Sequence, residues 1–448
     1  MTEDPEFWGA TKRRRRRLPG WSVGGGPGRV LTSIVIALAL LTVVGLVVLW
    51  PAKATLTKVP GLDYFKNAYQ ATVTSASSET CPGTDPSQPA QCVTLRARLL
   101  AGPDEGRTTT IQFPTPVAGT HFAVGDRILV VRIQLGGGGG GGGGSQGPAL
   151  YSYLDHARLP SLWWLAGLFA LAVVLLGRLR GLGALIGLAA SFFFLLRFML
   201  PSIINGHSPV LVSLVASCAI AFLALYLAQG FGKVTTVALL GTVGALGVTA
   251  LLGTIWVRFA DFTGLGSEEA FVVQLGAANV DLVGLLLAGI IIGALGAMDD
   301  MSVTQAAAVE ELRRANPTMS RRAIYRSGLR IGRDHVASIV NTLVLAYAGA
   351  SLPLLLVFLI SAQPPSLVLN SEAIAVEVVR ALVGSVGLIA CVPLTTWLAA
   401  YLMPPDEPTP SDAESERSIS PSGRHRAGQA SPTPPEEGAR DRSDRLPP

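Results

Sequence analysis

The sequence predicts a mainly α-helical integral membrane protein with a small β-rich domain outside the membrane. Of its 448 residues 49% are hydrophobic and only 15% are charged, and the mean hydropathy is +0.46. An apolar helix of about 20 residues crosses the roughly 30 Å hydrocarbon core of a bilayer. Eight runs fit this length, at residues 30–50, 161–177, 182–200, 209–228, 234–256, 281–298, 335–360 and 376–401. We therefore expect about eight transmembrane helices.

Basic residues predict the orientation of these helices. Six consecutive positive charges, Lys12 to Arg17, precede the first run, and the short link 177–181 and Lys233 are also basic. Seven arginines lie in the connection 299–334, which we expect to be a cytoplasmic loop. Eight alternating helices place all of these on one side, and positive charge favours the cytoplasmic side. Both termini are then cytoplasmic.

The N-terminal 50 residues read as a basic cytoplasmic tail, 1–29, followed by transmembrane helix 30–50. The basic tail is explained as a topology signal that contacts anionic lipid headgroups, at about 1 kcal/mol per charge near the surface. No folded module surrounds it, so nucleic-acid binding is not expected. Ala52 and Ala54 also resemble a signal-peptidase site, but a signal core is typically only 7–15 residues. We favour an uncleaved anchor, and either reading places residues 51–160 outside the membrane.

Residues 51–135 form the expected extracytoplasmic domain. Strand-like stretches at 92–100, 107–113 and 127–135 are separated by Gly, Pro and Asp turns, which predicts a small barrel or sandwich. A glycine run then begins the stretch 136–160, which we interpret as a flexible linker and re-entry into the membrane. A seven-helix transmembrane domain, 161–402, follows.

The four cysteines are of two kinds. Cys81 and Cys92 lie in the external domain, where a disulfide can persist, and bridging them stabilises the fold by roughly 3 kcal/mol on the chain-entropy model. Cys218 and Cys391 lie in apolar runs and are read as small packing residues. No CxxC pattern or His/Cys cluster predicts a metal site.

The C-terminal segment 403–448 is rich in Pro, Ser, Glu and Arg and has almost no aromatic residues. Such a composition buries too little apolar surface to order itself, so we predict a disordered cytoplasmic tail.

The adjacent carboxylates Asp299 and Asp300 follow the sixth run directly. Small residues at 289, 293 and 297 give that run a smooth face against which a neighbouring helix can pack closely. Ser302 and Gln305 match a capping box, in which a new helix starts after Ser302 and the carboxylates favour its positive end. Capping is the first explanation for the pair, and ion contact is the alternative.

A polar stripe on the seventh run strengthens the alternative that the carboxylate pair contacts an ion. Asp334, Ser338 and Asn341 stand at i, i+4 and i+7, and His335, Ser338 and Thr342 make an overlapping set. Polar groups inside a membrane usually face a bundle interior or a wet cavity. For Ser338 and Thr342 interhelical hydrogen bonding is the simpler reading. For Asp334, His335 and Asn341 function and packing stay open.

The outer connections carry acidic residues, and Glu377 and Arg380 stand three apart on one helix face. An ion pair is the simplest account of these two, and an acidic vestibule that gathers cations is the alternative. The connection 261–281 holds Asp261, Glu268, Glu269 and Asp281 and no Lys or Arg.

Two prolines lie inside predicted spans. Pro353 and Pro393 each remove a backbone hydrogen bond, so we expect both to break their helices. Broken helices line the solute sites of many transporters.

Enzyme signatures are absent from the sequence: there is no H-E-x-x-H, G-x-S-x-G or G-x-x-x-x-G-K-[ST] motif. We expect neither enzymatic activity nor a cofactor.

Three long motifs, 284–312, 332–356 and 371–388, resemble the YibE/F family of bacterial multi-pass membrane proteins. The resemblance reaches back through 177–192 and covers roughly residues 110–402. It implies a permease-like protein of the bacterial plasma membrane and carries no settled biochemical activity. The family pattern Asp-Asp-x-[Ser/Thr]-Val-Thr-Gln falls on Asp299, Asp300, Ser302, Val303, Thr304 and Gln305.

Two functions follow from these observations. The first is a secondary transporter of an ion or small solute, and the alternative is a non-transporting membrane scaffold or sensor that uses its external domain. The bilayer is the expected partner, and a homo-oligomer is left open. The candidate polar or ion-contact residues are Asp299, Asp300, Thr304, Gln305, Asp334, His335, Asn341, Asp281, Glu377 and Arg380.

Overall fold

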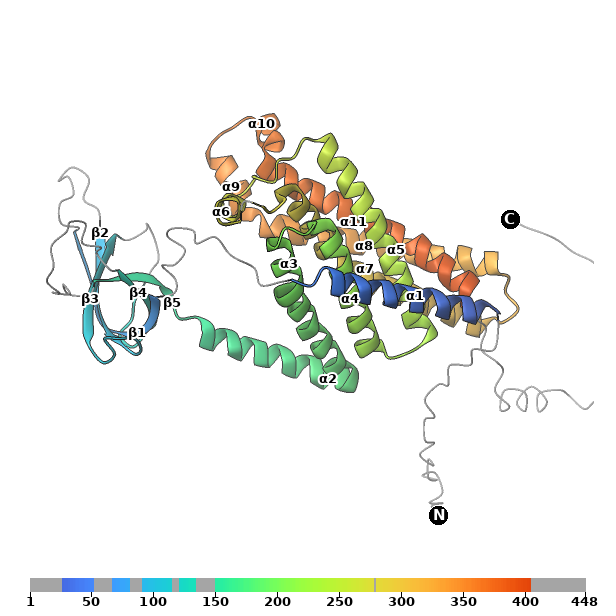
Figure 1. Ribbon diagram of the computed structural model, residues 1–448, viewed down its shortest axis with the longest axis horizontal. Coiled ribbons are helices and arrows are strands. Elements are labelled where there is room, and N and C mark those ends of the chain that lie inside the picture. The colour runs from blue at the N-terminus through green and yellow to red at the C-terminus, as the bar shows by residue number, and fades with distance from the viewer. Residues whose placement is uncertain are drawn as a thin grey trace, which may run out of the picture. The chain divides into compact units, whose positions relative to one another are not determined.

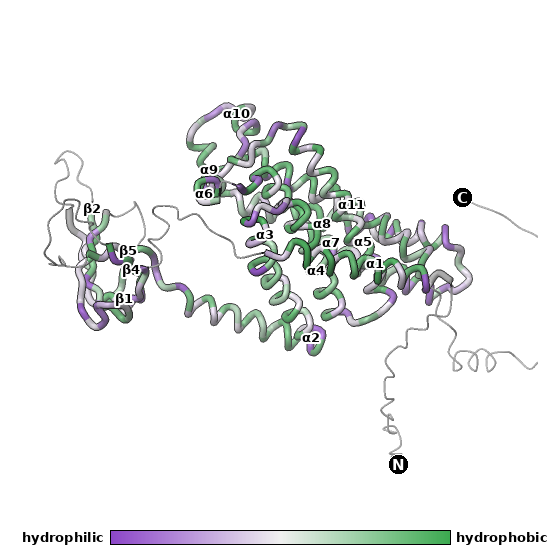
Figure 2. The backbone as a smooth tube through the Cα atoms, viewed as in Figure 1, coloured by the Kyte–Doolittle hydropathy of each residue, from purple (hydrophilic) through white to green (hydrophobic). Residues whose placement is uncertain are grey.

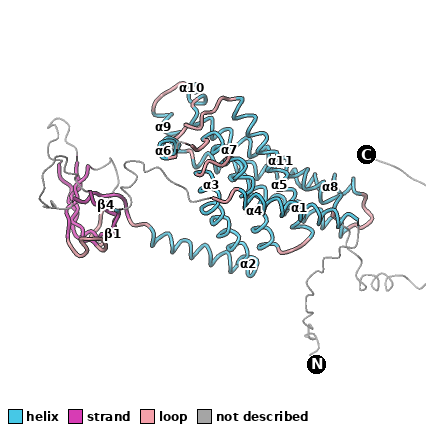
Figure 3. Tube along the Cα trace, viewed as in Figure 1, coloured by secondary structure: helices cyan, strands magenta, loops and turns pink. Residues whose placement is uncertain are grey.

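The computed structural model describes residues 26–51, 67–80, 91–114, 121–133, 150–277 and 279–403. These form a small antiparallel sheet and a set of mostly long helices (Figures 1 and 3). The predicted N-terminal and C-terminal tails and the glycine run lie outside the described residues.

The β domain contains five strands in the order β3-β2-β1-β4-β5, and all neighbours are antiparallel. The strands are β1 (Ala68–Thr80), β2 (Gln91–Leu99), β3 (Thr108–Pro114), β4 (Arg127–Ile133) and β5 (Leu150–His156). Strand β1 is long enough to pair with β4 along its first part and with β2 along the rest, and an irregularity between Val73 and Ser75 bends it. Strand β4 therefore pairs with β1, although β2 and β3 lie between these two strands in the sequence.

The two edge strands of this sheet come together, so the sheet curls toward a barrel. Phe113 of β3 stacks on Tyr153 of β5, with the ring centroids 4.8 Å apart. Alternate residues of the central strands fill the interior, among them Val73, Leu95 and Ile128. The predicted β-rich domain is thus present, and its last strand occupies residues that the sequence assigned to a linker.

Cys92 lies on β2 and is disulfide-bonded. Its predicted partner Cys81 lies outside the described residues, so the Cys81–Cys92 pairing stays a prediction.

The helices are α1 (Gly26–Val48), α2 (Leu159–Phe194), α3 (Leu200–Ile204), α4 (Pro209–Gln229), α5 (Lys233–Phe259), α6 (Glu268–Gly276), α7 (Leu282–Ala315), α8 (Arg321–Ala350), α9 (Leu352–Ile360), α10 (Pro365–Asn370) and α11 (Glu372–Leu402). A π-helical turn at Leu195–Met199 joins α2 to α3. Among the described residues, six helices are long and apolar enough to cross a membrane, or seven if α8 and α9 count together. Figure 2 shows the apolar colouring of these long helices.

The 46-residue helical stretch Leu159–Ile204 contains two of the predicted runs and is broken between them. Arg178 has φ of 51° and ψ of −129°, which is not helical. A Cβ built on Gly181 would lie 2.2 Å from the Val173 carbonyl oxygen. Residues eight apart in a straight helix are about 12 Å apart along the axis. The chain therefore doubles back at the basic link 177–181, which is compatible with two spans, and the total of eight stays a prediction.

The two prolines behave differently. At Ser351 the chain leaves α8 and enters α9 with a bend of 58°, and Pro353 occupies the first turn of α9, as expected. Helix α11, in contrast, continues through Pro393. The expected break in the last span is wrong, because the buried residues on both sides of Pro393 keep one packed face.

Helices α5, α7 and α11 pack together at the centre, with α4 and α8 against them (Figure 1). Glycines allow α5 and α11 to approach closely, since a Cβ on Gly241 would meet Thr395 and a Cβ on Gly387 would meet Thr249. The connection 299–334 is helical over most of its length, and its cytoplasmic location stays a prediction. Helix α7 continues to Ala315 and α8 begins at Arg321, so a short turn joins two long antiparallel helices.

Candidate functional site

Helix α7 passes through the carboxylate pair without a break. Ser302 is buried in its interior and donates a hydrogen bond to the Met298 carbonyl at 2.7 Å. The capping-box prediction is therefore wrong. The physical reason is packing: Met298, Met301 and Val309 continue the buried stripe of the helix across the proposed cap, so core contacts hold these residues helical.

Ser302 joins polar side chains from two other helices. Its Oγ lies 2.8 Å from Thr242 Oγ1 of α5 and 3.0 Å from Cys391 Sγ of α11, and all three residues are buried. In the contacts with Thr242 and Cys391 either partner can be the donor. Three helices thus meet at one hydroxyl.

Asp299 lies beside the same threonine and competes for its proton. The Thr242 hydroxyl faces the Asp299 carboxylate as well as Ser302, and it has one proton to donate. The Asp299 Oδ1 atom is enclosed and accepts no hydrogen bond from any described residue. The site is therefore short of one donor, and a buried carboxylate oxygen without a partner is costly.

Gln305 extends the polar set one turn further along α7. It is 1% exposed, and its Nε2 donates to the Gly328 carbonyl of α8 at 2.7 Å and to Thr396 Oγ1 of α11 at 2.8 Å. Gly332 leaves the space for this amide, because a Cβ there would lie 2.7 Å from Gln305 Oε1. Helices α7 and α8 are thus neighbours. We call Thr242, Asp299, Ser302, Gln305, Cys391 and Thr396 the polar cluster.

The polar cluster lies deep within the helices that carry it. Thr242 is nine residues after the start of α5 at Lys233, and Cys391 is eleven residues before the end of α11 at Leu402. At a rise of 1.5 Å per residue these separations are about 14 and 17 Å, close to half of a roughly 30 Å hydrocarbon core. Helix α7 extends well beyond Asp299, and the level of Asp299 relative to the membrane surface stays a prediction.

The two adjacent aspartates have different environments. Asp300 is exposed, and Thr304, also exposed, donates its hydroxyl proton to the Asp300 carbonyl at 2.9 Å. Successive residues are about 100° apart around a helix, so only one member of the pair can face the core. Asp299 belongs to the polar cluster, while Asp300 and Thr304 do not.

The polar stripe of α8 points away from the polar cluster. Asp334, His335 and Asn341 are exposed, while the face that packs on the bundle carries Ile324, Gly328 and Gly332. Helices α7 and α8 do touch, but through the two glycines of α8 and not through this stripe.

The remaining candidates lie toward the other end of α7. Glu377 and Arg380 form the ion pair that their spacing predicts, at 2.8 Å, and the Arg380 guanidinium lies 6.0 Å from the centre of the Tyr347 ring. Asp281 is the N-cap of α7 and accepts from the Gly284 amide at 3.0 Å. These contacts explain the three residues structurally.

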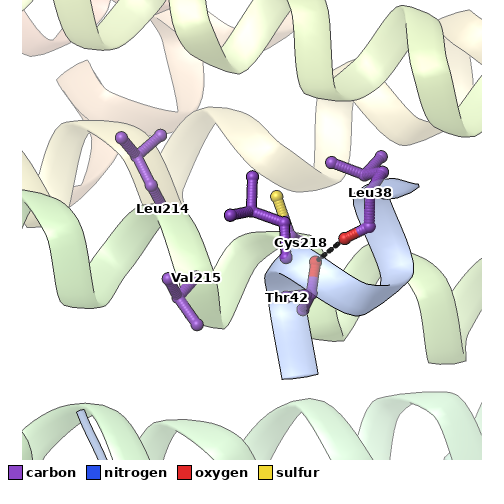
Figure 4. Close-up of a pocket in the computed structure, with 6 residues that line it drawn as sticks. Leu38, Thr42, Leu214, Val215 and Cys218 are labelled. Atoms are coloured by element: carbon purple, nitrogen blue, oxygen red, sulfur yellow. Dashed lines mark hydrogen bonds between the residues drawn. The ribbon is translucent and has the colours of Figure 1, made fainter. Parts of the chain in front are cut away.

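A pocket of about 130 Å³ opens between α1 and α4 (Figure 4). It is lined by apolar groups of Leu38, Leu41 and Leu214, and its one hydroxyl, on Thr42, donates to the Leu38 carbonyl of its own helix. This lining gives a polar solute no partner, so we place the candidate site at the polar cluster.

The model of the YibE/F-like protein family matches residues 165–405. The chain belongs to this family. All members of the polar cluster lie within the matched region. No curated protein and no solved structure matches the chain. Family membership and the long apolar helices together identify an integral membrane protein of the YibE/F-like family, and they name no substrate.

Four cluster residues were not among the candidate polar or ion-contact residues from the sequence, and one of them, Ser302, was named there only as a helix cap. Thr242 and Thr396 lie in apolar runs that contain many similar hydroxyls, and Cys391 was read as a packing residue. The only local signal was the spacing of Cys391 and Thr395 on one helix face, which is weak because hydroxyls often bond to their own helix.

Proposed function

We propose that this YibE/F-like protein is a secondary transporter, and that its solute or coupling ion passes the polar cluster. One observation carries the proposal: the enclosed Oδ1 of Asp299 has no hydrogen-bond donor among the described residues. Ionisable groups inside membrane spans typically mark ion pathways and proton relays.

The chemistry of the cluster favours a proton or a small monovalent cation. Asp299 Oδ1 has no donor, so a proton on this carboxylate or a cation bound to it would compensate for the missing contact. Asp299 provides one negative charge when it is ionised. The other groups within reach, the hydroxyls of Thr242 and Ser302 and the thiol of Cys391, are neutral at neutral pH. This single charge matches a singly charged ion better than a divalent one.

Adjacent aspartates provide a matched test of the proposal. Asp299→Asn removes the charge from the cluster, and Asp300→Asn removes the same charge from an exposed position one residue away. Purified variants are reconstituted in liposomes that contain a pH-sensitive dye, and proton, Na⁺ or K⁺ gradients are imposed. We expect Asp299→Asn to reduce flux by about tenfold or more, the equivalent of about 1.4 kcal/mol, and Asp300→Asn to leave it unchanged.

Two results would contradict this proposal. Equal flux through the Asp299→Asn variant and the unchanged protein excludes a role for the cluster, and no flux in any gradient with the unchanged protein removes the assignment to ion transport. Folding is controlled by comparing elution volume and melting temperature in detergent.

The second candidate function is a scaffold or sensor that uses the β domain. Its support is an aromatic group at one edge of the barrel, in which Phe122 stacks on His156 at 4.9 Å and Tyr153 contacts both. These rings are only partly buried, so a partner could contact them. Deletion of residues 67–156 separates the functions: a sensor loses its cellular phenotype while any flux through the helices persists.

A further inference from the structure

The β domain has the strand connectivity of a Greek-key barrel. Strands β1 to β4 stand in the order β3-β2-β1-β4, which is the Greek-key order, and β5 extends the sheet beyond β4 (Figure 1). Phe113 of β3 stacks on Tyr153 of β5, so the two edges meet and the barrel is nearly closed. A five-stranded, partly open Greek-key barrel is the architecture of the OB-fold, in which the face of the second and third strands binds oligosaccharides or oligonucleotides. The fold names no ligand by itself, so the side chains of that face decide the question.

Strands β1 to β4 present arginines and hydroxyls on the outer side of this barrel. Inward residues such as Val73, Leu95 and Ala97 alternate with outward ones, and directly opposite residues of antiparallel strands point to the same face. The strand pairing thus aligns two outer rows, which we call the basic face. The first row is Arg127, Thr72, Arg98 and Thr108, and the second is Ser75, Arg96 and Thr110.

The three arginines of the basic face are exposed, and their side chains form no hydrogen bond or ion pair within the part of the chain that the structure describes. Neither row contains an acidic residue. The other arginines described between β1 and α2 are paired: Arg107 and Arg132 contact Asp104 at 3.3 and 3.9 Å, and Arg158 contacts Asp155 at 2.6 Å. Positive charge is therefore gathered without compensation on one face of the barrel.

The spacing of these arginines indicates the size of an anionic ligand. Arg96 and Arg98 are two residues apart along β2, or about 7 Å, and Arg98 and Arg127 lie two strands apart, or about 10 Å. Arginine binds carboxylates and phosphates through two parallel hydrogen bonds. A ligand that neutralises all three arginines must carry several acidic groups at intervals of this size. A polymer therefore fits the basic face better than a single small anion.

We propose that the basic face binds an acidic polysaccharide. The hydroxyls of Thr72, Ser75, Thr108 and Thr110 lie between and beside the arginines and can donate to or accept from sugar hydroxyls. Single-stranded nucleic acid is the other common ligand of this fold, but aromatic side chains hold it by stacking on its bases, and neither row contains one. The predicted position of the domain outside the membrane agrees with a polysaccharide ligand. This inference rests on the β domain alone and does not depend on transport through the helices.

Fluorescence anisotropy of labelled sugar oligomers tests the proposal on the full-length protein in phosphatidylcholine nanodiscs. The acidic probes are oligogalacturonate, with a carboxylate on each sugar, and phosphorylated dextran, and the uncharged probe is a maltooligosaccharide. We expect at least one acidic probe to bind and the uncharged probe to bind far more weakly. Binding should weaken as the salt concentration rises, because salt screens exposed charges.

Arginine substitutions separate the basic face from the rest of the surface. Arg96→Gln, Arg98→Gln and Arg127→Gln should each weaken binding about threefold, and the triple variant about thirtyfold, on the scale of exposed charge pairs. Arg158→Gln is the matched control, because it removes the same charge from a residue that lies outside both rows and pairs with Asp155. Arg98→Lys keeps the charge and should retain most of the binding. Elution volume and melting temperature control for folding.

The proposal is overturned if neither acidic probe binds, if the maltooligosaccharide binds equally well, or if Arg158→Gln weakens binding as much as Arg98→Gln. It is also overturned if oligothymidylate or phosphatidylglycerol vesicles displace the labelled acidic sugar at a lower concentration of charge than the unlabelled sugar does. Those two results would assign the basic face to a nucleic acid or to a lipid surface.

Discussion

The hydrogen-bond partners of Gln305 lie on other helices and not at the nearby helix start that the sequence predicts. The spacing of Ser302 and Gln305 predicts a cap, with the amide reaching back to the helix start. In the structure the amide instead joins α7 to α8 and α11, because this part of α7 is buried between them. The residue was correctly singled out, but its role depends on the tertiary contacts.

Replacing Gln305 with leucine should destabilise the helical bundle. Gln305→Leu keeps the volume but leaves the Gly328 carbonyl without its side-chain donor and Thr396 without its contact. We expect a loss of about 1–2 kcal/mol, seen as a lower melting temperature in detergent. Thr304→Val is the control, since Thr304 is exposed and bonds only to its own helix. A melting temperature equal for both variants would refute this role for the amide.

At the scale of the elements, lengths and breaks of helices were only partly predictable. The break at the basic link was anticipated because two apolar runs flank it, whereas the continuation of α7 through two carboxylates was not. Carboxylates and a capping motif are local signals for a helix end. Buried contacts on both sides of them outweigh those signals, since propensities are worth less than packing.

At the turn between the two arms of α2, a substitution to glycine is predicted to increase stability. Arg178 holds φ of 51°, which glycine adopts readily and arginine does not. Arg178→Gly should therefore stabilise the protein by about 1 kcal/mol. Arg180→Gly removes the same charge at a helical position and should destabilise it by a similar amount. Thermal unfolding in detergent compares the two, and destabilisation by both would argue against the turn.

For the whole molecule, the hydrophobic runs predict the class of protein with little ambiguity. Residues 165–405 match the YibE/F-like family, and the long helices of that region are apolar enough to cross a membrane. The side on which each connection lies is a prediction from charge alone. If both arms of α2 cross the membrane, three spans lie between the β domain and the α4–α5 turn: two from α2 and one from α4.

Labelling from the two sides of the membrane tests this topology. Val124→Cys lies in the β domain and is 74% exposed, and Leu179→Cys lies in the basic link and is 86% exposed. We expect an impermeant maleimide to label the first in intact cells and the second only after permeabilisation. Labelling of both from outside, or no labelling of Leu179→Cys under either condition, would contradict eight spans.

The sequence by itself determined the membrane class, the presence of a β domain, the family and the Glu377–Arg380 pair. All of these rest on run length, composition or spacing within one element, which the chain carries locally. Tertiary structure decided which aspartate belongs to the polar cluster, that α7 and α8 touch through Gln305 and Gly328, and that the polar stripe of α8 is exposed. Helical periodicity defines the faces of a helix, but only packing against other helices decides which face each neighbour covers.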